Sequence, residues 1–141
     1  MLVFKYLGFE VIKLGAGKRD ADGIAKDRRG HFAVIYDCKC RGDGFTLLAG
    51  EERTMIEYIR KHKKMLENEG INRIHFAIIS SSFNAIPESR LKQIEREADI
   101  NEVVFIRVNI KYTHLSTADL TWVKAMQFFR KYCSGNFCSA T

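Results

Sequence analysis

The stretch His31-Phe-Ala-Val-Ile-Tyr-Asp-Cys-Lys39 decides how this sequence is predicted to fold. Its aromatic and β-branched residues favour a buried strand, and charged residues follow at its end. Because side chains alternate along a strand with a period of two, Asp37 and Lys39 are expected on one face and Cys38 on the opposite face. The strand therefore presents an acidic and a basic side chain together.

Strand-like and helix-like segments alternate around this stretch. In chain order we expect a short helix over residues 1–7, strands over 9–14, from 24 and over 31–36, a helix over 51–68, a strand over 74–79, a helix over 89–98, a strand over 103–108, and a helix from 116 or 117 to about 132. The charged, glycine-rich segment 15–23 is predicted to be a loop, and the turn at 27–30 joins two strands as a hairpin. Strands separated by helices predict an α/β sandwich with a central mixed sheet.

The composition is typical of a single globular domain. The chain has 141 residues, of which 46% are hydrophobic and 28% charged, so one domain over residues 1–141 is expected. No apolar run approaches the ~18–20 residues of a membrane helix, and residues 1–15 lack the layout of a secretory signal. We therefore expect a cytoplasmic protein that contacts no membrane. Neither the cysteines nor the histidines show a spacing that suggests a site; they are Cys38, Cys40, Cys133, Cys138, His31, His62, His75 and His114.

Positive charge is in excess, with 23 Lys and Arg against 17 Asp and Glu and a net charge of +6. This balance favours a polyanionic partner such as nucleic acid. The basic residues around the predicted hairpin are suited to bind phosphates without reading bases; they are Lys13, Lys18, Arg19, Lys26, Arg28, Arg29 and Arg41. The candidate DNA contacts within this set are Lys13, Lys18, Arg19 and Arg41. The alternative is that these charges are simply solvated.

Two acidic residues and a lysine form the candidate site. Asp22 comes just before one predicted strand and Asp37 ends the next, so a hairpin register can bring the two carboxylates together. Their oxygens and the backbone carbonyl of Cys38 are suited to Mg²⁺, which prefers hard oxygen ligands. Lys39 is expected to orient water or stabilise charge rather than to abstract a proton, because nearby carboxylates favour its charged form. Asp20 is a competing position for Asp22, and acidic residues at strand ends also occur without any chemistry.

Several segments together match a known pattern, namely Gly8–Gly15, Asp22-Gly23, Val34–Lys39, Gly44–Leu47 and Gly50–Ile59. They resemble the cleavage domain of the type IIS restriction endonuclease FokI, within the PD-(D/E)XK nuclease superfamily. The resemblance implies a restriction-endonuclease-like α/β/α sandwich that hydrolyses DNA phosphodiesters with Mg²⁺, or with Mn²⁺ as a substitute. It also implies that Asp22 and Asp37 are metal ligands and that Lys39 is the third catalytic residue. Ala21 stands where the superfamily pattern has proline.

The same resemblance implies particular partners. Similar domains cut double-stranded DNA only as homodimers, through an acidic and a basic residue four positions apart on a helix, and the matching positions here are Arg53 and Glu57 with reversed signs. A reversed pair remains complementary across a two-fold axis, although an ordinary intrahelical pair is the simpler interpretation. A separate recognition domain or subunit of a longer restriction enzyme would supply specificity. The alternatives are a non-catalytic nucleic-acid-binding module and a different nuclease of the superfamily, such as a resolvase or a repair nuclease.

Overall fold

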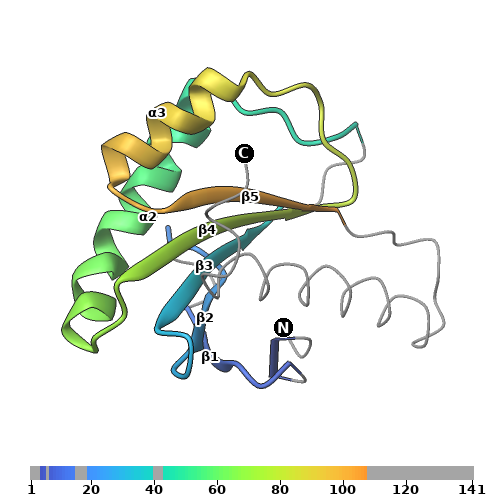
Figure 1. The fold of residues 1–141 in the computed structure, drawn as a ribbon. Helices are drawn as coiled ribbons and strands as arrows, with labels where there is room; N and C mark the ends of the chain where they lie inside the picture. The colour runs from blue at the N-terminus through green and yellow to red at the C-terminus, as the bar shows by residue number, and fades with distance from the viewer. Residues whose placement is uncertain (1–3, 6, 15–18, 40–42, 108–141) are drawn as a thin grey trace, which may run out of the picture.

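The computed structural model describes residues 4–5, 7–14, 19–39 and 43–107. Within these ranges the elements are β1 (Glu10–Lys13), β2 (Gly23–Asp27), β3 (Phe32–Cys38), α2 (Ala49–Asn68), β4 (Arg73–Ser80), α3 (Glu88–Ala98) and β5 (Glu102–Arg107). The strands form one sheet in the order β1-β2-β3-β4-β5, shown edge-on in Figure 1. Strands β1, β2 and β3 are antiparallel neighbours, whereas β3, β4 and β5 run parallel.

The predicted α/β architecture with a mixed sheet is confirmed. Each described strand and helix lies within about two residues of its predicted bounds, which is the usual uncertainty of element ends. The predicted helix over 116–132 lies outside the described residues, as does most of the helix predicted over 1–7. In the part of the chain that the structure describes, no helix is both long and apolar enough to cross a membrane.

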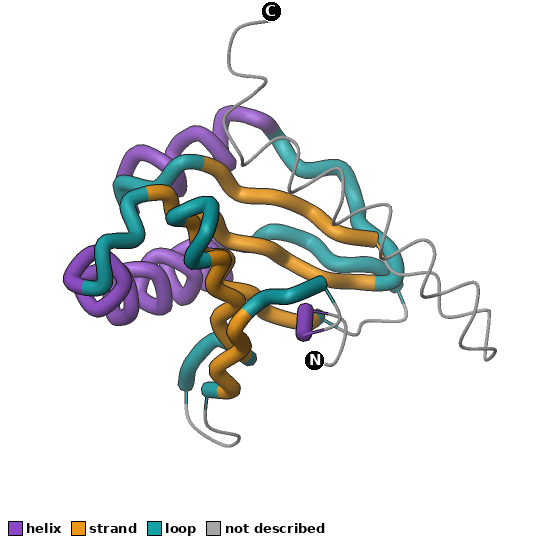
Figure 2. Tube along the Cα trace, turned by 60° about the horizontal axis from the view of Figure 1, so that its bottom comes forward, coloured by secondary structure: helices purple, strands orange, loops and turns teal. Residues whose placement is uncertain are grey.

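Apolar residues cover both faces of the sheet, as the alternation of side chains along each strand requires. On one face, Ile35, Phe76 and Ile78 pack against α2 and α3, the two long helices in Figure 2. On the opposite face, Phe32, Val34 and Tyr36 pack with other residues that include Phe4, Phe9 and Ile79. The central strand β3 is therefore buried on both sides, which holds its charged end in a defined place.

Helix α2 buries one stripe of its surface. The buried residues recur at helical spacing and are Met55, Ile56, Tyr58, Ile59, His62 and Leu66. The helix ends at Asn68, and Gly70, two residues later, has a φ of 80°, in the left-handed region that favours glycine after a helix. The first turn of α2 lies beside the charged end of β3, since Glu51 Oε2 is 3.5 Å from Lys39 Nζ.

Candidate active site

Asp22 and Asp37 face each other across the β2–β3 hairpin. The register pairs Gly23 with Tyr36, so that continuing it by one residue places Asp22 opposite Asp37. The backbone N–H of Asp22 donates to the carbonyl of Tyr36 at 3.0 Å. Its carboxylate oxygen Oδ2 accepts a hydrogen bond of 2.7 Å from the backbone N–H of Cys38. Side chain and backbone thus tie Asp22 to the end of β3.

The ammonium of Lys39 lies between two carboxylates. Its Nζ atom is 2.9 Å from Asp37 Oδ2 and 3.5 Å from Glu51 Oε2. Asp37 and Lys39 both point toward the α2 side of the sheet, whereas Cys38 packs on the opposite face, as the strand alternation predicted. Glu51 comes from the first turn of α2.

Burial and neighbouring charge perturb both members of this pair. Burial raises the pKa of Asp37; Lys39 opposes this effect and the adjacent Asp22 carboxyl adds to it. Burial alone would lower the pKa of Lys39, but the carboxylates of Asp37 and Glu51 outweigh it and hold that pKa above its usual value. Lys39 is therefore an ammonium at neutral pH, which suits it to hold water or to stabilise negative charge.

The donor set at this position fits a hard divalent cation. Two carboxylates lie close enough for Asp22 to disfavour ionisation of Asp37, and a divalent cation between them would relieve that repulsion. The carbonyl of Cys38 follows directly in the chain. Among the described residues, no group of three His, Cys, Asp or Glu side chains is arranged to hold a metal ion. The side-chain donors of the candidate site are therefore two carboxylates.

Asp20, the competing position, points elsewhere. Its Oδ1 lies 2.7 Å from His62 Nε2 and its Oδ2 lies 2.5 Å from Lys61 Nζ, so both oxygens contact α2. Although burial raises the pKa of Asp20, the hydrogen bonds from Lys61 and His62 hold it below its usual value. The structure thus places Asp22, and not Asp20, beside Asp37.

Three of the basic residues grouped with the site in the sequence lie far from it. Lys26, Arg28 and Arg29 are at the opposite end of β2 from Asp22, because the strand runs from Gly23 to Asp27. The expectation that these three residues flank the carboxylates was therefore wrong.

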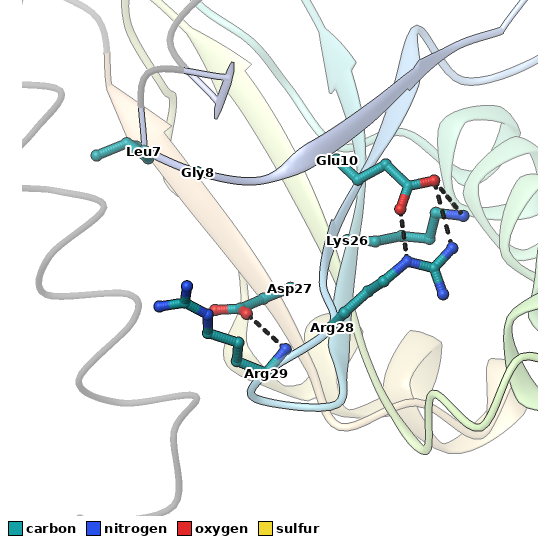
Figure 3. A pocket seen from close by; sticks show the side chains of 7 residues that line it. All are labelled: Leu7, Gly8, Glu10, Lys26, Asp27, Arg28 and Arg29. Carbon is teal, nitrogen blue, oxygen red and sulfur yellow. Dashed lines mark hydrogen bonds and ion pairs between the residues drawn. The ribbon is translucent and has the colours of Figure 1, made fainter.

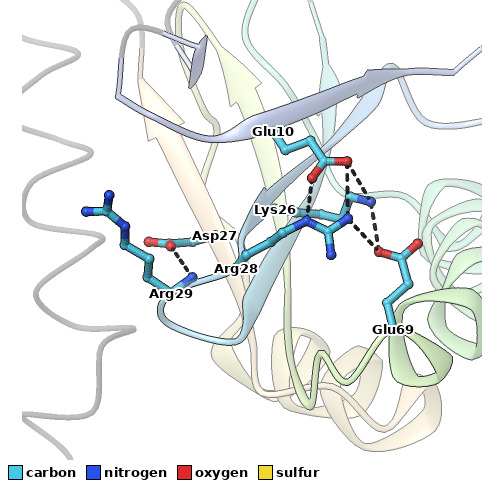
Figure 4. A network of polar contacts seen from close by, with 6 residues as sticks. All are labelled: Glu10, Lys26, Asp27, Arg28, Arg29 and Glu69. Atoms are coloured by element: carbon cyan, nitrogen blue, oxygen red, sulfur yellow. Dashed lines mark hydrogen bonds and ion pairs between the residues drawn. The ribbon is translucent and has the colours of Figure 1, made fainter.

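Two of these three residues belong instead to a network of ion pairs (Figure 4). Lys26 is only 3% exposed, and its Nζ lies 3.2 Å from Glu10 Oε1 and 2.9 Å from Glu69 Oε2. Arg28 Nε lies 2.6 Å from Glu10 Oε2. The network joins the first two strands to the end of α2. Its members other than Glu69 border a cavity of about 400 Å³ (Figure 3), which is lined by Leu7, Gly8, Glu10, Lys26, Asp27, Arg28 and Arg29.

Of the candidate DNA contacts, Lys13 and Arg19 are described, and both are exposed. Lys13 ends β1, the strand that is hydrogen-bonded to β2 beside Asp22. Lys18 and Arg41 lie outside the described residues. An exposed cation near the carboxylates remains available to a phosphate, so Lys13 and Arg19 stay candidates.

The predicted pairing residues Arg53 and Glu57 lie on the exposed side of α2. Within the described ranges no ion pair joins them. Arg53 borders a cavity of about 260 Å³ between α2 and α3, together with Ala49, Glu52, Ile56, Gln93, Ile94 and Glu97. Both side chains are thus open to a second molecule.

The sequence did not predict two features of this region. Glu51 lies beside Lys39, and Asp20 and His62 contact each other. The position of Glu51 in the first turn of the helix that follows the charged strand was a usable signal. No spacing relates Asp20 to His62, because 41 residues separate them and only the packing of α2 against the sheet brings them together.

The mixed sheet carries two carboxylates and a lysine at the end of its central strand, and comparison with known families assigns it to the nuclease domains of the restriction-endonuclease class. A family model described as the cleavage domain of FokI matches residues 1–119, so the chain belongs to the FokI cleavage domain family. The resemblance noted in the sequence is thereby confirmed.

The solved structures that share the fold include two of restriction endonuclease FokI. The structure of restriction endonuclease FokI matches with a TM-score of 0.70 and 18% identity over 95% of this chain and 26% of that chain. The structure of restriction endonuclease FokI bound to DNA matches with a TM-score of 0.65 and 18% identity over 94% of this chain and 25% of that one. This chain thus spans about a quarter of their length. Among curated proteins no significant match was found.

Proposed function

We propose that this domain hydrolyses DNA phosphodiester bonds with the help of Mg²⁺ and without reading base sequence. The observation that carries the proposal is the juxtaposition of Asp22, Asp37 and Lys39 at the end of β3. Membership of the FokI cleavage domain family supports the same reaction class. The likeness to a FokI structure bound to DNA supports DNA as the substrate, and we propose that it is cut in its double-stranded form.

Each residue has a distinct role in the proposed reaction. Asp22, Asp37 and the carbonyl of Cys38 would hold the ion, which, when bound, polarises the phosphate and stabilises developing negative charge. Lys39 orients the water whose oxygen attacks phosphorus and whose proton passes to bulk solvent, while the bond to the leaving sugar oxygen breaks and that oxygen takes up a proton from solvent water. Glu51 holds the Lys39 ammonium at the site, 3.5 Å from its own carboxylate. Exposed Lys13 and Arg19, with Lys18 and Arg41, would contact the DNA backbone.

Cleavage of supercoiled plasmid tests this proposal. We expect nicking and linearisation with Mg²⁺ or Mn²⁺, none with EDTA, and a fall of at least about 100-fold for Asp37→Asn. Asp43→Asn is a matched control, because Asp43 is an exposed acidic residue of the following loop. DNA binding without cleavage would instead select a binding module, and a preference for branched DNA would select a resolvase-like enzyme.

We further propose that two copies pair through α2 when DNA is cut, and that a recognition domain or subunit supplies specificity. Arg53 of one copy would meet Glu57 of the other, since both are exposed on the same side of α2. At limiting protein concentration, Arg53→Glu should abolish cleavage because two acidic side chains then face each other. Adding Glu57→Arg should restore it. Lys64→Glu, at another exposed position of α2, controls for the change in net charge; unchanged cleavage by Arg53→Glu alone would refute the pairing.

A further inference from the structure

A buried carboxylate–imidazole pair lies two residues before Asp22. Asp20 Oδ1 is 2.7 Å from His62 Nε2, and the side chains of Asp20 and His62 are 8% and 10% exposed. Lys61 contacts the other oxygen of Asp20, but its side chain is 54% exposed, so water competes for that contact. The contact with His62 is the one shielded from solvent.

Hydrogen bonds or core packing hold each of the three consecutive residues 20–22. Asp20 Oδ1 also accepts a hydrogen bond from the backbone N–H of Ala21 at 2.9 Å, and Ala21 is buried in the core beneath α2. The next residue, Asp22, is hydrogen-bonded to Tyr36 and, through its carbonyl, to the N–H of Leu14. Asp20 is therefore the point at which this segment is attached to α2.

Burying these polar groups is not explained by stability alone. Apolar side chains of similar volume often stabilise a fold as well as a buried polar pair does, because burial of the polar groups costs desolvation free energy. A hydrogen-bonded pair adds a defined direction and distance, which apolar packing does not. What it defines here is the path of the chain immediately before Asp22.

We propose that Asp20 and His62 are positioning residues that hold the Asp22 carboxylate in register with Asp37. The chemical consequence of this inference rests on the proposed function, since a misplacement of about 1 Å can cost about 100-fold in rate. The positional claim itself concerns only the protein. It is independent of whether DNA is cut.

The Cys38 amide reports the position of Asp22 without any activity. Because it donates to Asp22 Oδ2 at 2.7 Å, its hydrogen exchange should accelerate when that carboxylate moves away. The neighbouring amide of Lys39 donates to the Ile79 carbonyl at 2.7 Å and is an internal control within the sheet.

The experiment compares His62→Leu with His62→Gln by NMR-detected hydrogen exchange at neutral pH. Leucine cannot donate to Asp20, whereas the side-chain amide of glutamine can. We expect exchange at Cys38 to rise by about tenfold or more in the leucine variant, to stay near the wild-type rate in the glutamine variant, and to remain unchanged at Lys39 in both. Should His62→Leu prove unfolded, Asp20→Ala, which removes the acceptor of His62, is compared with Asp20→Asn, which keeps a carbonyl oxygen that can accept the same hydrogen bonds.

Plasmid cleavage with Mg²⁺ adds a second measurement. We expect the leucine variant to lose up to about 100-fold in turnover at saturating DNA, with little change in KM, and the glutamine variant to recover most of the loss. An unaltered Cys38 exchange rate in His62→Leu, or equal losses in the two variants, would overturn the inference. If the wild-type domain fails to cut while the exchange pattern holds, the proposed function fails and the positioning role stands.

Discussion

Gly23 lies beside Asp22 at the start of β2 and has no room for a side chain. A Cβ atom there would lie 2.3 Å from Tyr36 Oη, 2.5 Å from Tyr36 Cζ and 2.8 Å from the carbonyl oxygen of Ile12. Since favourable contact needs about 3.5 Å, the tyrosine ring would have to move by roughly 1 Å. That ring is 2% exposed and stacks on Phe4, with 4.8 Å between centroids. We expect Gly23→Ala to lower the free energy of unfolding by about 2–3 kcal/mol, the upper part of the range for overpacked cores.

Urea unfolding followed by circular dichroism measures this cost, and a double-mutant cycle locates its cause. In a Tyr36→Leu background the ring is absent, so Gly23→Ala should cost at least about 1 kcal/mol less than in the wild type. Gly50→Ala is the matched control, because a Cβ atom at Gly50 meets nothing within 4 Å. It should be neutral or stabilise α2 by up to about 1 kcal/mol. Equal costs in both backgrounds, or a Gly23→Ala variant as stable as wild type, would refute the reasoning.

Two other predictions concern ionisable side chains that the sheet buries. Lys26→Met should lower the free energy of unfolding by about 2 kcal/mol, because it removes the cation between Glu10 and Glu69. Urea titration measures this change. A variant as stable as wild type would show that the network contributes nothing to stability. Burial, and to a lesser extent Arg73, lowers the pKa of His75 to about 4. The unfolded chain then binds more protons between about pH 6.5 and 4, so stability should be complete above pH 6.5 and fall by up to about 3 kcal/mol as the pH drops to 4. The measurement compares the denaturation midpoints of wild type and His75→Gln across that pH range. An equally steep pH dependence in the variant would assign the loss of stability to groups other than His75.

The juxtaposition of Asp22 and Asp37 was predictable because it depends on local rules. A hairpin turn joins neighbouring strands, and antiparallel pairing then sets which residues face each other. The period of two placed Lys39 on the same face as Asp37 and Cys38 on the other, and the structure agrees. These predictions need only the chain from β2 to the end of β3.

The misplaced basic residues show where that reasoning ends. Lys26 and Arg28 are close to Asp22 in sequence, but a strand separates them from it in space, because each residue of β2 advances the chain by about 3.3 Å. Proximity in sequence indicated a shared site, whereas the register assigns them to an ion-pair network with Glu10 and Glu69.

The sequence by itself determined the class of fold, the approximate bounds of the strands and helices, and the pairing of acidic side chains across one hairpin. Hydrophobic periodicity and turn residues are properties of short segments, so they can be read without knowing the rest of the molecule. Only the tertiary structure decided that Glu51 reaches Lys39 and that His62 reaches Asp20. Those contacts depend on how α2 docks on the sheet, and the docking is set jointly by every apolar residue in the interface between them.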